Sequence, residues 1–218
     1  DCWNDKQGNE EQCTNRVNVS GTFPSSPAFN SLSVQSVQPT FVSRTLSGRR
    51  QARQIAGQFF TMTATFPPMT RAQFAPIDAF VMKQRGQYET FTLILPVMST
   101  GLGAPAGTPL IRGADQTGRT LATDGWSTGV VIFKAGDYLK LANHDKVYKV
   151  VADVTSNASA SADTPITIEP ALITSPADNS AITHTNVPFL VSLTTGVQEY
   201  STGTSGLFSY EVDFAEVL

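Results

Sequence analysis

The stretch Phe60-Thr61-Met62-Thr63-Ala64-Thr65-Phe66 decides the fold class of this chain. Apolar residues and threonines alternate along it with a period of two. This predicts a β-strand with one face toward a core and the other toward water or a neighbouring chain. Residues 210–217 (YEVDFAEV) show the same alternation, and residues 91–95 and 189–193 are apolar enough for central strands. The chain is therefore expected to be mainly β.

One short α-helix is expected directly after the first of these strands, near residues 70–85. Thr70 and Gln73 have the spacing of a capping box at its start. Gly86 is placed to end it, and Pro76 should remove one of its backbone hydrogen bonds. The apolar face of the helix consists of Phe74, Ile77, Phe80 and Val81. Such a short amphipathic helix is expected to lie against a sheet.

The pattern changes between residues 99 and 186. A linker of small residues, 99–107, is followed by short strand patterns separated by turn signals such as Thr123-Asp124-Gly125 and Ala135-Gly136-Asp137. Close strand spacing of this kind predicts a small barrel or sandwich. Three parts are therefore expected: a polar N-terminal arm (1–26), a discontinuous β lobe (27–100 and 187–218) and an inserted β lobe (101–186). The compact part should begin at Pro27 or Phe29.

Composition narrows the classes of partner. Of the 218 residues, 40% are hydrophobic and 15% are charged, and Thr, Ser, Gln and Asn fill the remaining polar positions. A surface of this kind is easily desolvated against another subunit, which favours a place in a large assembly. A net charge of −3 argues against broad nucleic-acid binding, and no run reaches the ~18 apolar residues of a membrane helix.

Cys2 and Cys13 lie close together in the polar opening stretch. The sequence is compatible with a disulfide between them and equally with a pair of free thiols. A metal site would need two further ligands nearby, and no histidine is present there. No metal and no cofactor is therefore expected.

Catalytic chemistry has weak candidates in this sequence. His144 and His184 could each serve a nucleophilic triad, but no Gly-x-Ser-x-Gly elbow accompanies them, and exposed loop histidines are the favoured interpretation. Acids such as Asp137 are interpreted as turn formers. Trp126, after Asp124-Gly125, could offer its indole face to a sugar, although a packing role is favoured. No catalytic residue is therefore assigned.

One basic cluster remains, made of Arg44, Arg49, Arg50 and Arg53 around Gly48. The cluster is small and lacks the interleaved aromatic residues of nucleic-acid sites. Arginine is also enriched at protein interfaces. These four residues are the candidates for a subunit interface with an acidic surface on an adjoining subunit, ahead of a plain solvated loop.

Several stretches together resemble the distal-tail or tail-tip structural proteins of tailed phages and prophages. They are residues 66–72 (FPPMTRA), 84–91 (QRGQYETF), 107–111 (GTPLI), 123–126 (TDGW), 134–139 (KAGDYL), 150–153 (VVAD), 166–172 (ITIEPAL) and 210–214 (YEVDF). No single motif is specific, and the resemblance rests on their order and spacing from about Ser26 to Leu218. The opening arm with its two cysteines departs from the family pattern.

The resemblance implies a β-barrel or sandwich lobe of the tail-tube type, interrupted by the inserted β lobe. It implies a non-enzymatic structural subunit of a tail tip or baseplate, assembled in the bacterial host cytoplasm into the virion. Such subunits form rings, often sixfold, that join the tail tube to hub or receptor-binding proteins. The alternatives are a carbohydrate-binding tail module based on Trp126 and, third, a tail-associated wall hydrolase.

Overall fold

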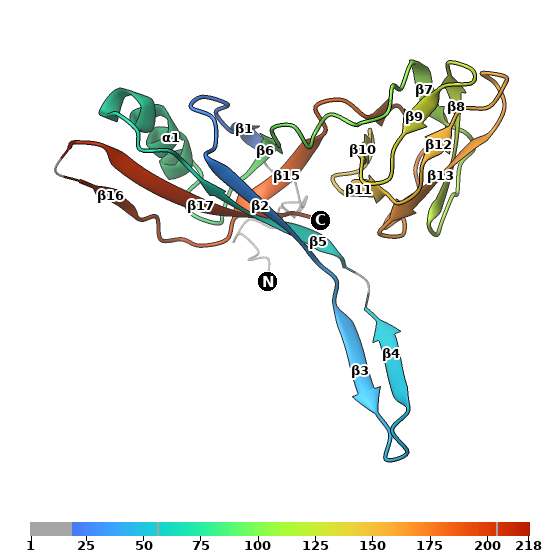
Figure 1. Ribbon diagram of the computed structural model, residues 1–218, viewed down its shortest axis with the longest axis horizontal. Coiled ribbons are helices and arrows are strands. Elements are labelled where there is room, and N and C mark those ends of the chain that lie inside the picture. Colours follow the sequence, from blue (N-terminus) through green and yellow to red (C-terminus); the bar gives the residue numbers. More distant parts are fainter. Residues whose placement is uncertain (1–18, 56, 204) are drawn as a thin grey trace, which may run out of the picture.

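The computed structural model describes residues 19–55, 57–203 and 205–218. Two sheets and two hydrophobic clusters make up most of it, and the described residues contain a single α-helix. Figure 1 shows the two sheets side by side, with a thin two-stranded arm projecting from between them. The expected mainly β fold with one helix is confirmed. The predicted domain boundaries stay a prediction.

The first sheet has seven strands in the order β1-β6-β15-β17-β5-β2, with β16 paired to β17. Neighbours are antiparallel except β1 and β6, which run parallel. The strands are β1 (Val19–Thr22), β2 (Ser31–Val37), β5 (Phe59–Thr65), β6 (Thr90–Ile94), β15 (Pro188–Leu193), β16 (Tyr200–Thr202) and β17 (Phe208–Glu216).

The two faces of this sheet differ because its strands alternate, as the sequence predicted. On the covered face, Met62 of β5 lies between Val34 of β2 and Phe214 of β17. On the open face, Thr63 lies between Ser33 and Asp213 in the neighbouring register positions. The core therefore occupies one side of the sheet, and a polar face remains on the other.

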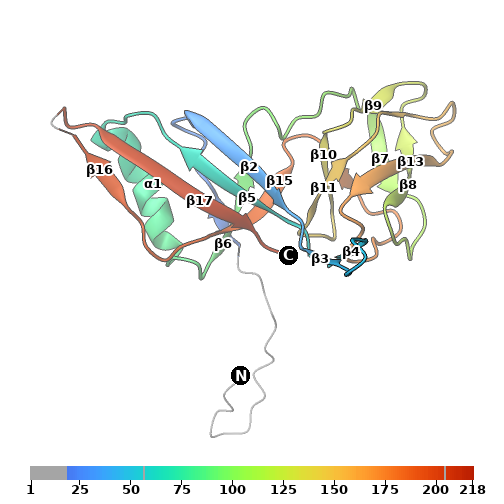
Figure 2. The ribbon, with the colours of Figure 1, turned by 60° about the horizontal axis from the view of Figure 1, so that its bottom comes forward.

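Helix α1 (Arg71–Lys83) packs on the covered face through Phe74, Ile77 and Val81, and in Figure 2 it lies behind β17. The capping box forms: the backbone N–H of Thr70 donates to Gln73 Oε1 at 3.0 Å. Left-handed Arg85 (φ 55°) and Gly86 (φ 69°) follow the C-cap, so the chain turns one residue before the predicted stop. No helix in the described ranges is long and apolar enough to cross a membrane.

The inserted part folds as a small barrel. Its six strands follow the order β14-β10-β11-β13-β8-β7, and a bridge between Leu110 and Ala181 brings the two ends together. The strands are β7 (Gly107–Ile111), β8 (Thr120–Trp126), β10 (Tyr138–Leu141), β11 (Val147–Val150), β13 (Thr164–Glu169) and β14 (Ile182–Thr183). Short strands β9 (Val131–Phe133) and β12 (Val154–Thr155) pair beside it. The first sheet, in contrast, stays open.

The compact part begins earlier than the sequence indicated. Strand β1 pairs with β6, and the Phe23 side chain is buried in the first core, where its ring meets Phe91 and Phe214. Phe23 stands among polar residues, so no periodic pattern in the sequence marks it as part of the core. Cys2 and Cys13 lie outside the described residues.

A buried carboxylate joins the two lobes. Glu216, at the end of β17, accepts the backbone N–H of Phe60 at 3.1 Å and that of Val147 at 3.0 Å. It also pairs with the ammonium of Lys146, and the two side chains are 0% and 3% exposed. The Lys146 Nζ lies 4.6 Å from the centre of the Phe60 ring. Because Phe60 belongs to the first sheet and Val147 to the barrel, this cluster fixes one lobe on the other.

Replacing Glu216 with Gln should lower the free energy of unfolding by about 3 kcal/mol, because the ammonium of Lys146 is left buried without its counter-charge. Denaturant unfolding measures this loss. Glu211→Gln, at an exposed position of the same strand, is the control and should change stability by under ~0.5 kcal/mol. Adding Lys146→Met to Glu216→Gln should recover part of the loss. Equal losses in Glu216→Gln and the control contradict the assignment.

Candidate subunit interface

The clearest unpartnered element is the arm, a hairpin of β3 (Thr40–Arg44) and β4 (Arg50–Gln54). Within the described ranges it forms a separate two-stranded sheet, so no other described strand pairs with either of its edges. Its tip turns at Gly48, whose φ of 78° favours glycine and whose N–H donates to the carbonyl of Thr45 at 2.9 Å. The predicted basic loop around Gly48 is therefore the tip of a projecting hairpin.

Apolar side chains are also exposed along this hairpin. Phe41 is 63% exposed and Val42 is 47% exposed, and Leu46 at the tip is fully exposed. An isolated two-stranded ribbon is of marginal stability in water. A hairpin that shows both open edges and large apolar side chains is typical of an element that is completed by another chain.

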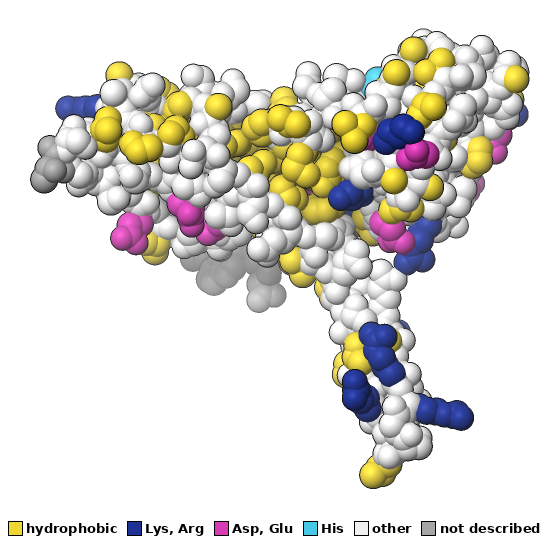
Figure 3. All heavy atoms as spheres, viewed as in Figure 1, with side chains coloured by type: hydrophobic (Ala, Val, Ile, Leu, Met, Phe, Trp, Pro, Cys, Tyr) yellow, Lys and Arg dark blue, Asp and Glu magenta, His cyan; other side chains and the backbone are white. Residues whose placement is uncertain are grey.

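The four candidate arginines all lie on the arm. Arg44 and Arg50 stand directly opposite each other across the two strands, Arg53 is opposite Phe41, and Arg49 adjoins the turn. Strand alternation places Arg44 and Arg50 on one face of the ribbon and Arg53 on the other. Like charges in directly opposed positions destabilise a strand pair. Figure 3 shows these cationic side chains gathered on the arm, away from the acidic side chains visible on the body.

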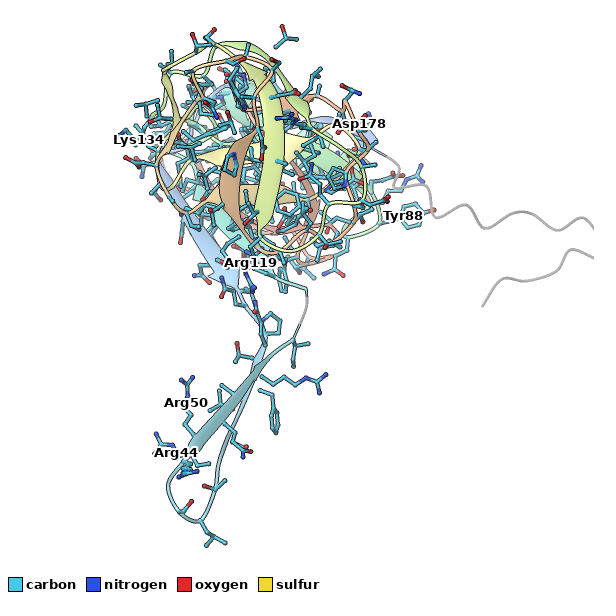
Figure 4. All side chains as sticks on the ribbon, turned by 90° about the vertical axis from the view of Figure 1, so that its right-hand side faces the viewer. Arg44, Arg50, Tyr88, Arg119, Lys134 and Asp178 are labelled. Atoms are coloured by element: carbon cyan, nitrogen blue, oxygen red, sulfur yellow. The ribbon has the colours of Figure 1, made fainter. Side chains whose placement is uncertain are left out.

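The base of the arm is tied to the barrel by Arg119. Its Nη2 donates to Gln54 Oε1, at the end of β4, at 2.8 Å, and its Nε lies 2.6 Å from Glu169 Oε1 of β13. Figure 4 shows Arg119 at the base of the hairpin and Arg44 and Arg50 toward its tip. Sequence reasoning missed Arg119, because no local pattern marks a contact between residues 65 positions apart.

A second surface that no other described element covers is the open face of the first sheet. Its outward positions carry hydroxyl groups on β2 and β5 and two exposed carboxylates, Glu211 and Asp213, on β17. Thr65 donates to Glu211 at 3.1 Å and Thr63 to Asp213 at 2.5 Å. These acids also escaped prediction, although their alternation with Val212 and Phe214 in the sequence was a usable signal.

Trp126 is a core residue. It is 1% exposed, its ring packs edge-on against Phe133 at 5.5 Å between centroids, and its Nε1 donates to the Thr123 hydroxyl at 2.8 Å. A sugar ring cannot reach an indole face that is enclosed in this way. The carbohydrate-platform hypothesis therefore loses the residue on which it rested.

Neither the acids nor the histidines form a catalytic arrangement within the described ranges. Asp137 is buried and accepts backbone N–H groups from Leu102, Gly103 and Lys134, so it holds the linker to a turn. The same ranges contain no cluster of three potential metal ligands. His144 is 7% exposed, with Nδ1 2.8 Å from the Tyr148 hydroxyl, so the expectation of an exposed loop histidine is wrong for it.

Burial lowers the pKa of His144 and of His184 below the ordinary value of 6.5. Each of the two imidazoles then binds a proton more tightly in the unfolded chain than in the folded chain. The free energy of unfolding should therefore fall as the pH drops below about 7, and this decline should end below the folded pKa values. Denaturant unfolding between pH 7 and pH 5 tests this, and His184→Gln should reduce the slope. A stability that rises over this range contradicts it.

Replacing Arg119 with Ala should loosen the arm without unfolding the lobes, because it removes the contact with Gln54 and a partly exposed ion pair. Hydrogen exchange at residues 51–55 should accelerate, while the free energy of unfolding changes by under ~1 kcal/mol. Arg112→Ala, another exposed arginine of the barrel, is the matched control. Unchanged exchange in the arm argues against this anchoring role.

Comparison with known protein families identifies the barrel. Residues 99–187 match the family model described as distal tail protein pb9, B domain. The matched range begins at the linker after β6 and ends just before β15, so it contains every barrel strand. No curated protein sequence matches the chain significantly. The resemblance to phage distal tail proteins is thus confirmed over residues 99–187, and this match supports a structural role in a phage tail.

Proposed function

We propose that this chain is a ring-forming subunit of a phage tail tip or baseplate, which joins the tail tube to distal hub or receptor-binding components. The observation that carries the proposal is the arm β3–β4, a projecting ribbon with two open edges and exposed apolar and cationic side chains. An open β edge can be completed by a neighbouring subunit. The match to a distal tail domain supports the location in the tail.

The two lobes have different tasks in this proposal. The discontinuous lobe, residues 27–100 and 187–218, builds the ring because it carries both the arm and the open polar face. The inserted lobe, residues 101–186, faces a neighbour or solvent. A contact between unlike surfaces closes only when the rotation between subunits completes a circle, and the family resemblance implies a ring that is often sixfold. Assembly takes place in the host cytoplasm before incorporation into the virion.

The double reversal Arg49→Glu with Arg50→Glu should block assembly while the monomer stays folded, because these side chains are exposed at the tip of the arm. Native mass spectrometry of the purified protein and electron microscopy of particles measure assembly, and thermal unfolding measures the fold. Arg71→Glu with Arg112→Glu reverses two exposed charges away from the arm and should assemble normally. Normal assembly of the arm variant refutes this role, and a strictly monomeric wild-type protein refutes the ring.

A further inference from the structure

The arm carries no acidic residue of its own. No Asp or Glu occurs between Glu11 and Asp78 in the sequence, so the whole hairpin and both strands that lead to it are free of acids. In the part of the chain that the structure describes, the ion pairs are formed by Arg85, Arg119, Lys134 and Lys146, and none involves an arginine of the arm. The opposed pair Arg44 and Arg50 thus requires anions from outside the arm.

The open face of the first sheet supplies acids in a suitable arrangement. Glu211 and Asp213 are two residues apart on β17, so both point outward and their backbone positions are about 7 Å apart. Each carboxylate takes one threonine hydroxyl from β5 through a single oxygen, which leaves the other oxygen for a guanidinium. The guanidinium of arginine carries five N–H donors, any of which can donate to such a carboxylate oxygen.

A groove adjoins these two acids. It has a volume of about 580 Å³ and lies between β5, β17 and the segment that leads into β16. Glu199 adds a third carboxylate to its lining, and Val197, which is 76% exposed, adds an apolar side chain. The groove therefore combines negative charge with apolar surface, as the arm combines arginines with Phe41, Val42 and Leu46. Both charge and hydrophobicity match between the two surfaces.

The arm cannot reach the groove of its own chain. It leaves the first sheet where Val37 pairs with Phe59, whereas Thr65, which pairs with Glu211, lies at the other end of β5. Six residues of strand separate the two ends by about 20 Å, and the arm points away from the sheet in Figure 1. Only the arm of another molecule can therefore reach this groove.

We propose that the arm of one copy binds the open face of the next copy, with Arg44 and Arg50 paired to Glu211 and Asp213. This inference rests on the proposed ring and names its contact. Each subunit donates an arm at one end of its first sheet and receives one at the other end. The contact is heterologous, so repetition closes a ring when the geometry permits.

Charge exchange tests the contact. Arg44→Glu with Arg50→Glu makes the arm acidic, and Glu211→Lys with Asp213→Lys makes the groove basic. Either variant alone should lose subunit association by ~100-fold or more, because like charges then face each other. The chain with all four substitutions should recover it. An equimolar mixture of the arm and groove variants should also assemble, with the two forms alternating, because each arm then meets a groove of opposite charge.

Native mass spectrometry and sedimentation velocity measure association, with Asp163→Lys, an exposed acid of the barrel, as the control for reversal. Thermal unfolding checks that each variant monomer is folded. The neutral variant Glu211→Gln with Asp213→Asn keeps acceptors for the threonine hydroxyls but removes the negative charge, so it should weaken association less than the charge reversal does. Normal rings from both single-surface variants overturn the arm–groove contact but leave the ring itself intact. A wild-type protein that forms no oligomer overturns both the contact and the proposed function.

Discussion

The carboxylate of Glu216 is the interaction on which the arrangement of the molecule depends. It accepts hydrogen bonds from backbone N–H groups of both lobes and neutralises the buried ammonium of Lys146. A buried charge persists only where it is paired and hydrogen-bonded, so each lobe needs the other at this point. The two sheets consequently keep a fixed relation. Arg119, which belongs to the barrel, is thereby positioned to hold the base of an arm that grows out of the first sheet.

The first lobe carries two charged surfaces of opposite sign. Four arginines lie on the arm, and the exposed acids Glu211 and Asp213 of β17 lie on the open sheet face beside threonine hydroxyls. In a monomer both surfaces stay in water. The hairpin then adds nothing to the stability of the fold, because its two strands are of marginal stability on their own. In the proposed ring the two surfaces meet, and the arm acquires the packing it lacks in the monomer. The architecture therefore makes sense as one unit of a larger assembly.

Local patterns in the sequence predict much of this fold. The alternation around Met62 predicts strand β5 and which of its residues face the core, and Thr70 and Gln73 predict the start of α1. Both features depend on residues only a few positions apart. Contacts between distant residues escape such patterns. Phe23 is a lone apolar residue in a polar stretch, and the partners of Glu216 lie 69, 70 and 156 residues away. The arginine cluster was found as a charge pattern, but its opposed register needed the structure.

An electron cryomicroscopy reconstruction of the assembled ring, alone or in the tail, at a resolution that shows side chains, tests the contact between arm and groove directly. The arm of each subunit should lie across β5 and β17 of its neighbour, with density joining Arg44 and Arg50 to Glu211 and Asp213. A ring in which the arms contact other proteins or point into solvent, while Glu211 and Asp213 stay exposed, contradicts this contact.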